Sequence, residues 1–313
     1  MLSYLVGRLF ALLPVLAVVA IVVFMLVHVT PGDPARVLLG EAATEQQVAA
    51  LRHDLGLDRP LPVQFTLWIG RALHGDLGES LFLHIPVVKD IVLHLGPTAT
   101  LSALGMSVAL LIGIPVGIVS AVFRNSWLDQ ASLGLALLGA AVPSFWLGLS
   151  LIVLFAVDLG WLPSSGYQSP ANGLRQSMQY LVLPALALGV PSSSLIIRFT
   201  RSSLLDVLGN DYIRTARAKG LRGSAVIFRH GLRNALVPIL TVVGLTFAAL
   251  MGGAVVTETV FSLPGIGQLV VSSVLRRDYP VIQGVTLMVA TAYVVINLGV
   301  DLLYFAVDPR VRY

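Results

Sequence analysis

The 313-residue chain contains no cysteine and only two lysines, and charged residues make up 12% of it. The absence of cysteine excludes disulfides, thiolate metal sites and cysteine nucleophiles. A phosphate-binding P-loop needs serine or threonine after its lysine, but Lys89 precedes Asp90 and Lys219 precedes Gly220. No histidine is followed by glutamate, which excludes the HExxH zinc motif. The sequence therefore predicts a protein that is not itself an enzyme and that binds no cofactor or metal.

Hydrophobic residues account for 56% of the chain and cluster in runs of about twenty, the length a helix needs to cross a bilayer. The first run, Leu9–Val27, is longer than the apolar region of a signal peptide, so we expect a retained helix. We predict an all-α polytopic membrane protein with six transmembrane helices, while five or seven remain alternatives. The expected spans are Gly7–His28, Thr98–Val122, Leu128–Val157, Tyr180–Thr200, Ala235–Thr257 and Val281–Val307. Thr98 is expected to cap the second span, and Pro143 to kink the third.

The polar segments between these spans predict the domain organisation and the orientation. We expect an N-terminal helix (1–29), an extracytoplasmic segment (30–97), a five-helix core (98–307) with a cytoplasmic loop (201–235), and a cytoplasmic tail (308–313). Six spans place both termini and the arginine-rich 201–235 loop on one side, which the positive-inside rule assigns to the cytoplasm. Arg276 and Arg277 count against this orientation. The net charge of +4 therefore reflects the orientation of the chain in the membrane, and we expect a lipid bilayer rather than nucleic acid as the partner.

Ionisable residues within the spans are few and lie near the helix ends. Glu258, Asp301 and Arg198 are predicted to form interhelical hydrogen bonds or to anchor the helices. Their positions disfavour a secondary carrier, which usually places such groups near the midplane. Candidate residues for a translocation path are Ser107, Ser144 and Thr246, with helix–helix hydrogen bonding as the alternative role. The spacing of Gly113 and Gly117 suits close helix packing, although lipid-facing small residues are an equal alternative.

A short amphipathic helix is predicted within the cytoplasmic loop. Asn210 or Asp211 can cap its start, and Gly220 can adopt the left-handed conformation at its end. Helical spacing places Tyr212, Thr215, Ala216 and Lys219 on one face. This helix either docks in a groove of a partner protein or lies on anionic lipid.

The chain resembles the permeases of binding-protein-dependent ABC importers, in the dipeptide/oligopeptide/nickel branch and in its DppB/OppB-like form. The resemblance extends over nearly the whole chain. Ala216 and Gly220 match the branch's cytoplasmic EAA loop, whereas Arg214 and Thr215 replace the Glu-Ala that opens its general pattern. The other matching segments are Pro31–Pro34, Leu55–Phe65, Gly75–Gly78, Arg233–Pro238, Glu258–Gly267 and Asp308–Tyr313.

The resemblance implies a type I ABC importer permease with a MetI-like fold, in the bacterial cytoplasmic membrane. It implies a second homologous permease (DppC/OppC-like), two P-loop ATPase subunits that bind ATP and Mg, and an extracytoplasmic substrate-binding protein. The expected substrate is a di- or oligopeptide, with nickel or glutathione as alternatives within the branch. A carrier or channel without ATPase partners remains the competing function, and a membrane-embedded enzyme is disfavoured.

The same resemblance implies the site residues. Ala216 is expected to face the ATPase groove, where a bulky side chain would hold the helix out, and Gly220 is expected to need a positive φ. An outer re-entrant segment is implied at Glu258, Pro264, Gly265 and Gly267. The residues implied in coupling to an ATPase subunit are Asp211, Tyr212, Arg214, Thr215, Ala216, Arg217, Lys219 and Gly220.

Overall fold

The computed structural model describes residues 2–29, 34–39, 43–54 and 56–307. The expected C-terminal tail (308–313), and residues 31–33 of the first matching segment, lie outside these residues. The structure forms two compact units. Unit 1 comprises residues 1–96 and 268–294, and unit 2 comprises residues 97–267 and 295–313.

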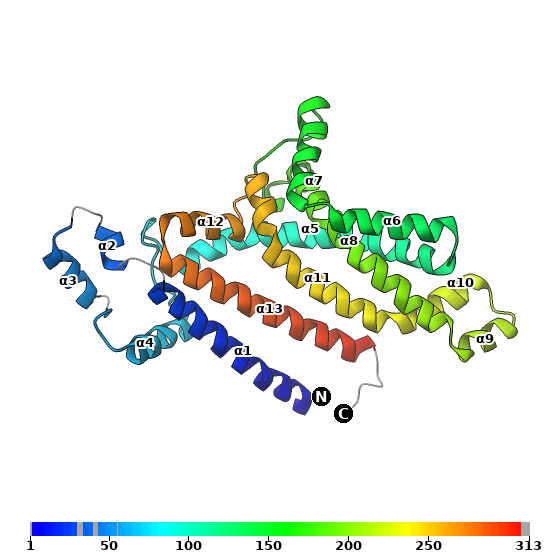
Figure 1. Cartoon of the computed structure of the whole chain (residues 1–313), viewed down its shortest axis with the longest axis horizontal. Coiled ribbons are helices and arrows are strands. Elements are labelled where there is room, and N and C mark those ends of the chain that lie inside the picture. The colour runs from blue at the N-terminus through cyan, green and yellow to red at the C-terminus, as the bar shows by residue number, and fades with distance from the viewer. Residues whose placement is uncertain (1, 30–33, 40–42, 55, 308–313) are drawn as a thin grey trace. The chain divides into compact units, whose positions relative to one another are not determined.

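Helices make up nearly all of the regular structure (Figure 1). Among the described residues the only β-type pairing is an isolated bridge between Glu79 and Pro86. The α-helices are α1 (Leu2–Val29), α2 (Pro34–Leu39), α3 (Glu45–Asp54), α4 (Leu61–Leu73), α5 (Val87–Val122), α6 (Trp127–Ala141), α7 (Ser144–Leu151), α8 (Leu174–Leu208), α9 (Asp211–Ala218), α10 (Gly223–Ala225), α11 (Arg233–Val260), α12 (Ile266–Arg276) and α13 (Tyr279–Val307). The remaining helical segments are two π-helical stretches, η1 (Ile152–Asp158) and η3 (Val226–Leu232), and the short η2 (Pro170–Asn172).

Within the described residues, five helical segments are long and apolar enough to cross a membrane. They are α1, α5, α8, the continuous run from α10 into α11, and α13. The pair formed by α6 and the α7–η1 segment makes a sixth span if it is counted as one. The all-α membrane fold is therefore confirmed, with five or six apolar spans.

The third expected span is broken rather than kinked. Its two halves, Trp127–Ala141 and Ser144–Asp158, are bent by 95°. Val142, at the end of α6, is extended with φ −80° and ψ 119° because the ring of the following Pro143 disfavours helical geometry before it. Pro143 then precedes the first turn of α7, a position at which a backbone N–H would form no hydrogen bond within the helix, so its absence costs nothing there. The prediction of a single kinked helix was wrong at this point.

Two other boundaries also differ from expectation. Helix α5 begins at Val87, so Thr98 is an interior residue of the helix and does not cap it. The segment between α11 and α13, in which no helix was predicted, contains the eleven-residue helix α12.

Glycines allow α5 and α8 to pack closely in unit 2. A Cβ on Gly113 would lie 2.6 Å from the Ile196 side chain, and one on Gly117 would lie 2.6 Å from the Thr200 side chain. On the opposing helix, a Cβ on Gly189 would lie 2.4 Å from the carbonyl oxygen of Gly105. The spacing of Gly113 and Gly117 therefore serves close helix approach, the first of its two interpretations.

Candidate functional site

Helix α9 has the two boundaries that the sequence predicts, with one difference in chemistry. Asn210 precedes the helix in an extended conformation, but its side chain accepts no capping hydrogen bond. Its amide nitrogen donates instead to the carbonyl oxygens of Asp206 and Val207, both at 3.2 Å, and so caps the C-terminal end of α8. Gly220 has φ +78°, which confirms its left-handed conformation.

One face of α9 packs against its own chain. Ile213 and Ala216 are buried in a small cluster with Val226, and Leu208 packs against it. Ala216 is only 7% exposed, so its small side chain serves close packing with neighbouring segments of this chain. In the single chain Ala216 thus faces inward, and a contact between Ala216 and a partner's groove stays a prediction. A sequence pattern identifies a helix face that needs small residues, but it does not tell which surface that face meets.

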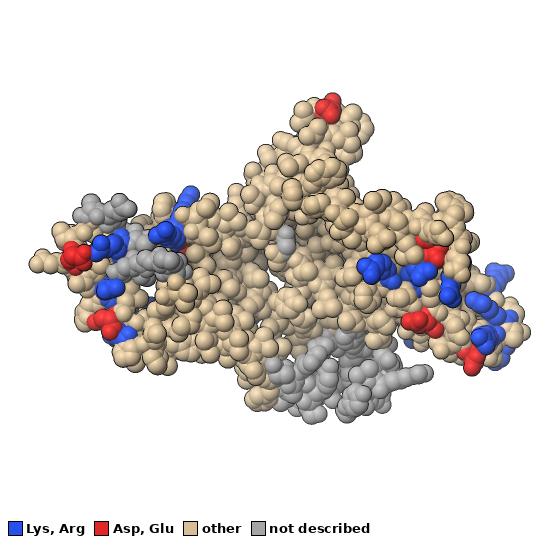
Figure 2. All heavy atoms as spheres, viewed as in Figure 1, with Lys and Arg blue, Asp and Glu red and all other residues tan. Residues whose placement is uncertain are grey.

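The opposite face of α9 and the two residues after the helix are exposed, and they carry three basic residues and one acidic residue. Asp211 and Arg214 form an exposed pair with their side chains 3.4 Å apart. Lys and Arg side chains gather at the end of unit 2 that carries α9 and α10 (Figure 2). The exposed residues of the predicted coupling set are Asp211, Tyr212, Arg214, Thr215, Arg217, Lys219 and Gly220.

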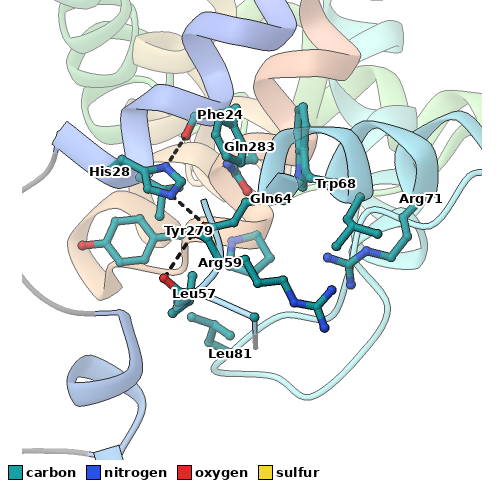
Figure 3. A pocket seen from close by; sticks show the side chains of 14 residues that line it. Phe24, His28, Leu57, Arg59, Gln64, Trp68, Arg71, Leu81, Tyr279 and Gln283 are labelled. Atoms are coloured by element: carbon teal, nitrogen blue, oxygen red, sulfur yellow. Dashed lines mark hydrogen bonds between the residues drawn. The ribbon is translucent and has the colours of Figure 1, made fainter. Parts of the chain in front are cut away.

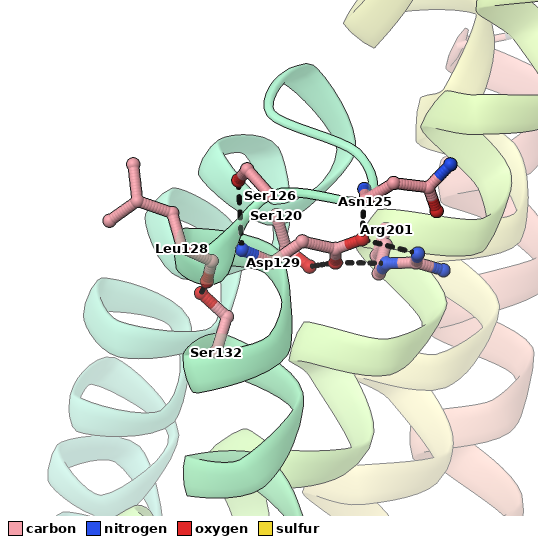
Figure 4. A network of polar contacts seen from close by, with 7 residues as sticks. All are labelled: Ser120, Asn125, Ser126, Leu128, Asp129, Ser132 and Arg201. Carbon is pink, nitrogen blue, oxygen red and sulfur yellow. Dashed lines mark hydrogen bonds and ion pairs between the residues drawn. The ribbon is translucent and has the colours of Figure 1, made fainter.

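A partly buried ion pair joins α6 to α8, the helix that leads to α9 (Figure 4). Arg201 of α8 donates from Nε and Nη2 to the two carboxylate oxygens of Asp129 in α6, at 2.7 and 2.8 Å. The Ser120 hydroxyl of α5 donates to the same carboxylate at 2.6 Å, and the backbone N–H of Asn125 donates at 2.9 Å. Three helices are thereby tied together. Asp129 is not among the predicted site residues, although an acidic residue in the first turn after the capping Ser126 was a signal for it.

A second buried carboxylate organises the predicted outer segment. Glu258 is fully buried and accepts hydrogen bonds from the Thr98 hydroxyl at 2.5 Å and the Gly267 N–H at 2.7 Å. Thr98 in turn accepts from the N–H of Ile266 at 2.8 Å. A Cβ on Gly265 would lie 2.3 Å from the Glu258 carboxyl carbon, so this glycine admits the carboxylate. The predicted interhelical hydrogen bonding of Glu258 is confirmed, and Pro264 lies in the turn that it holds.

Two of the three path candidates line one cavity of about 410 Å³ in unit 2. Ser144 at the start of α7 and Thr246 in α11 face it together with Ser192 of α8. The Thr246 hydroxyl has no hydrogen-bond partner among the described residues. Leucines supply most of the remaining wall. Ser107 does not line this cavity: it is exposed on α5, and its hydroxyl donates to the Ala103 carbonyl at 2.8 Å.

The other two intramembrane ionisable residues add little to the site. Arg198 is exposed on α8, and the side chain of Asp301 lies outside the described part of α13.

Comparisons with known proteins identify the chain. Residues 113–313 match the family model described as binding-protein-dependent transport system inner membrane component, and residues 1–82 match the N-terminal model of the same transport systems. The glutathione transport system permease protein GsiC of Salmonella choleraesuis (strain SC-B67) is 47% identical over 313 residues, covering 100% of both chains. The probable peptide ABC transporter permease protein y4tP of Sinorhizobium fredii (strain NBRC 101917 / NGR234) is 46% identical over 310 residues, covering 99% of each.

A solved structure shows the same fold. The MetNI methionine ABC transporter, in an inward-facing conformation, aligns with a TM-score of 0.59 and 20% identity, over 70% of this chain and 96% of that chain. The chain therefore belongs to the binding-protein-dependent transport system inner membrane component family, as a multi-pass permease subunit of an ABC importer in the inner membrane.

Proposed function

We propose that this permease forms half of a path for small peptides, including the tripeptide glutathione, and that α9 couples the path to an ATPase subunit. The names of the two relatives, one a glutathione permease and one a probable peptide permease, support this substrate class. The second permease, the two ATPases that bind ATP and Mg, and the extracytoplasmic binding protein belong to the same proposal. So does an orientation with both termini in the cytoplasm.

The cavity in unit 2 is proposed as part of the path. Ser144, Ser192 and Thr246 bring three hydroxyl groups to an otherwise mainly apolar wall. The Ser192 hydroxyl already donates to the Leu188 carbonyl at 2.8 Å, and the unpaired Thr246 hydroxyl is itself buried, so the half-buried Ser144 is the residue best placed to bond a peptide's amide. Few and weak polar contacts suit a path, because a substrate has to leave each position as well as enter it.

The observation that carries the coupling role is the double attachment of α9. Its buried face packs on Val226 of η3, which continues into α11, and on Leu208 at the end of α8. Nearby, Leu204 of α8 packs with Ala235 and Ile239 of α11. A force on the exposed face of α9 therefore acts on both α8 and α11, two of the helices that line the cavity, as rigid-body switching requires. Because basic residues outnumber acidic ones by three to one on that face, we expect an acidic groove on the ATPase.

The coupling role is tested with the complete importer reconstituted in lipid vesicles. Arg217→Glu places a negative charge on the exposed face of α9, and we expect the number of peptides transported per ATP to fall at least about tenfold. Arg124→Glu is the matched control, because Arg124 is equally exposed but lies between α5 and α6. Peptide uptake and peptide-stimulated ATP hydrolysis are measured together.

Two outcomes would contradict the proposal. Normal peptide uptake and normal peptide-stimulated ATP hydrolysis in Arg217→Glu would show that this face does not couple the path to the ATPase. Peptide uptake that persists when the ATPase subunits are omitted would favour a carrier or channel.

A further inference from the structure

Unit 1 contains a cavity of about 420 Å³ that none of the preceding roles explains. Its wall combines the C-terminal end of α1, the link between α3 and α4, helix α4 and the first turns of α13 (Figure 3). Phe24, Leu57, Trp68 and Leu81 give this wall an apolar surface. A cavity of this size suits a small organic ligand rather than a single ion.

The wall is held in place before any ligand binds. The rings of Phe24 and Trp68 have centroids 5.9 Å apart. Gln64 donates from its amide nitrogen to the carbonyl oxygens of Leu57 at 3.1 Å and Arg59 at 2.7 Å. Its amide oxygen lies 3.1 Å from Nε2 of His28. These contacts connect α1 to the α3–α4 link, so they fix the backbone from which Arg59 extends.

Two arginines bring positive charge to the same cavity. Figure 3 shows the guanidinium groups of Arg59 and Arg71 turned toward each other. Neither forms an ion pair with a side chain that the structure describes. The neighbouring Asp58 hydrogen-bonds another residue: its carboxylate lies 2.8 Å from Nδ1 of His53, and this hydrogen bond, with a smaller effect from the charge of Arg59, lowers the pKa of Asp58. Both side chains are exposed, and two positive groups on one cavity wall attract an anion.

An adjoining cavity of about 340 Å³ is lined by two acidic residues as well as by Arg71. It shares Trp68, Arg71 and Leu81 with the first cavity, and Asp76 and Glu79 also line it. The two cavities thus offer arginines, an apolar wall and carboxylates in one continuous region of unit 1. This set complements a zwitterion that has a carboxylate, an apolar side chain and an ammonium group.

We propose that the Arg59–Arg71 cavity binds the C-terminal carboxylate of a short peptide with an apolar side chain, at a site separate from the path in unit 2. The peptide's carboxylate accepts charge-assisted hydrogen bonds from the two guanidinium groups. Its side chain packs on Trp68, and its ammonium group is directed toward Asp76 and Glu79. The choice of a peptide rests on the proposed function.

The test measures direct binding of the dipeptide alanyl-phenylalanine and of its C-terminal amide. The full permease–ATPase complex is used without the binding protein, in phosphatidylcholine nanodiscs. We expect the amide to bind at least about tenfold more weakly than the acid. Arg59→Gln and Arg71→Gln should each weaken binding of the acid by a similar factor and leave binding of the amide unchanged. The matched control is Arg175→Gln, which removes an exposed arginine of unit 2 that lines neither cavity.

Equal affinities for acid and amide, or unchanged binding in both arginine variants, would overturn the proposal. So would a cavity occupied by lipid phosphate: the dipeptide would then fail to bind, and added phosphatidylglycerol would quench tryptophan fluorescence in the parent but not in Arg71→Gln. Uptake by the complete importer separates the two proposals. Peptide uptake without direct binding rejects only this site, whereas absence of peptide uptake in the parent rejects the proposed substrate.

Discussion

Two carboxylates of unit 2 are buried, and each is surrounded by donors. Asp129 accepts from Arg201, Ser120 and a backbone N–H. Glu258 accepts from Thr98 and from the N–H of Gly267. Burying a carboxylate is costly unless hydrogen bonds and opposite charge compensate it. At the residue scale, then, both side chains hold helices together rather than perform chemistry.

The ion pair gives the residue-scale prediction. Asp129→Asn removes the charge that compensates Arg201, and we expect a loss of about 2–4 kcal/mol in the free energy of unfolding. The loss stays below that for a fully buried pair because the Arg201 side chain is 21% exposed. Asp211→Asn makes the same change in an exposed pair and should alter stability by less than about 0.5 kcal/mol. Chemical unfolding of the purified variants in detergent measures both, and similar effects in the two would contradict the assigned role.

At the element scale, the contact between α5 and α8 depends on the absence of side chains. Gly113 and Gly117 of α5 face Ile196 and Thr200 of α8, and Gly189 of α8 lies against the backbone of Gly105. Larger residues would separate the two helices and disturb the cavity that α8 lines. The neighbouring break at Val142–Pro143 has the opposite origin, since proline ends the helix there through its own ring.

Alanine substitution distinguishes a contact glycine from an ordinary one. Gly189→Ala would place Cβ 2.4 Å from a backbone oxygen, and we expect it to lower stability by about 1–3 kcal/mol because the helices must move apart. Gly134→Ala in α6 meets no atom within 4 Å. It should raise stability by about 0.5–1 kcal/mol through the helix propensity of alanine. Thermal unfolding compares the two, and effects of the same sign would contradict the close packing.

For the whole molecule, the proposed function depends on surfaces that face partners on both sides of the membrane. The exposed face of α9 is assigned to an ATPase, and the cavities of unit 1 to peptide arriving from outside. These assignments require residues 201–235 and residues 43–86 to lie on opposite sides.

The lack of cysteine makes this orientation directly measurable. Thr66→Cys in α4 and Ser224→Cys in α10 each introduce a single exposed thiol. We expect a membrane-impermeant maleimide to label Thr66→Cys in intact cells, and Ser224→Cys only after the membrane is disrupted. Labelling of both in intact cells, or the reverse pattern, would refute the proposed topology.

Much of the architecture could be predicted because it depends on short stretches of sequence. Apolar runs locate the helices, since the bilayer requires every backbone group to be satisfied within its own segment. The left-handed conformation of Gly220 could also be predicted, because it depends on the residue type at that position. Thr98 was wrongly predicted as a cap because α5 begins at Val87 and continues through Pro97. Its hydrogen bond to Glu258, 160 positions away, leaves no signal in the spacing along the chain.

The sequence by itself determined that this protein is a helical membrane permease, because hydropathy, motif order and the absent P-loop are properties of the chain alone. Only the tertiary structure decided that Ala216 packs inward, that Ser144 and Thr246 share a cavity without Ser107, and that Asp129 pairs with Arg201. It also brought Arg59 and Arg71 to one cavity. The reason is that packing selects among the surfaces that a helix offers, and packing is settled by residues distant in sequence.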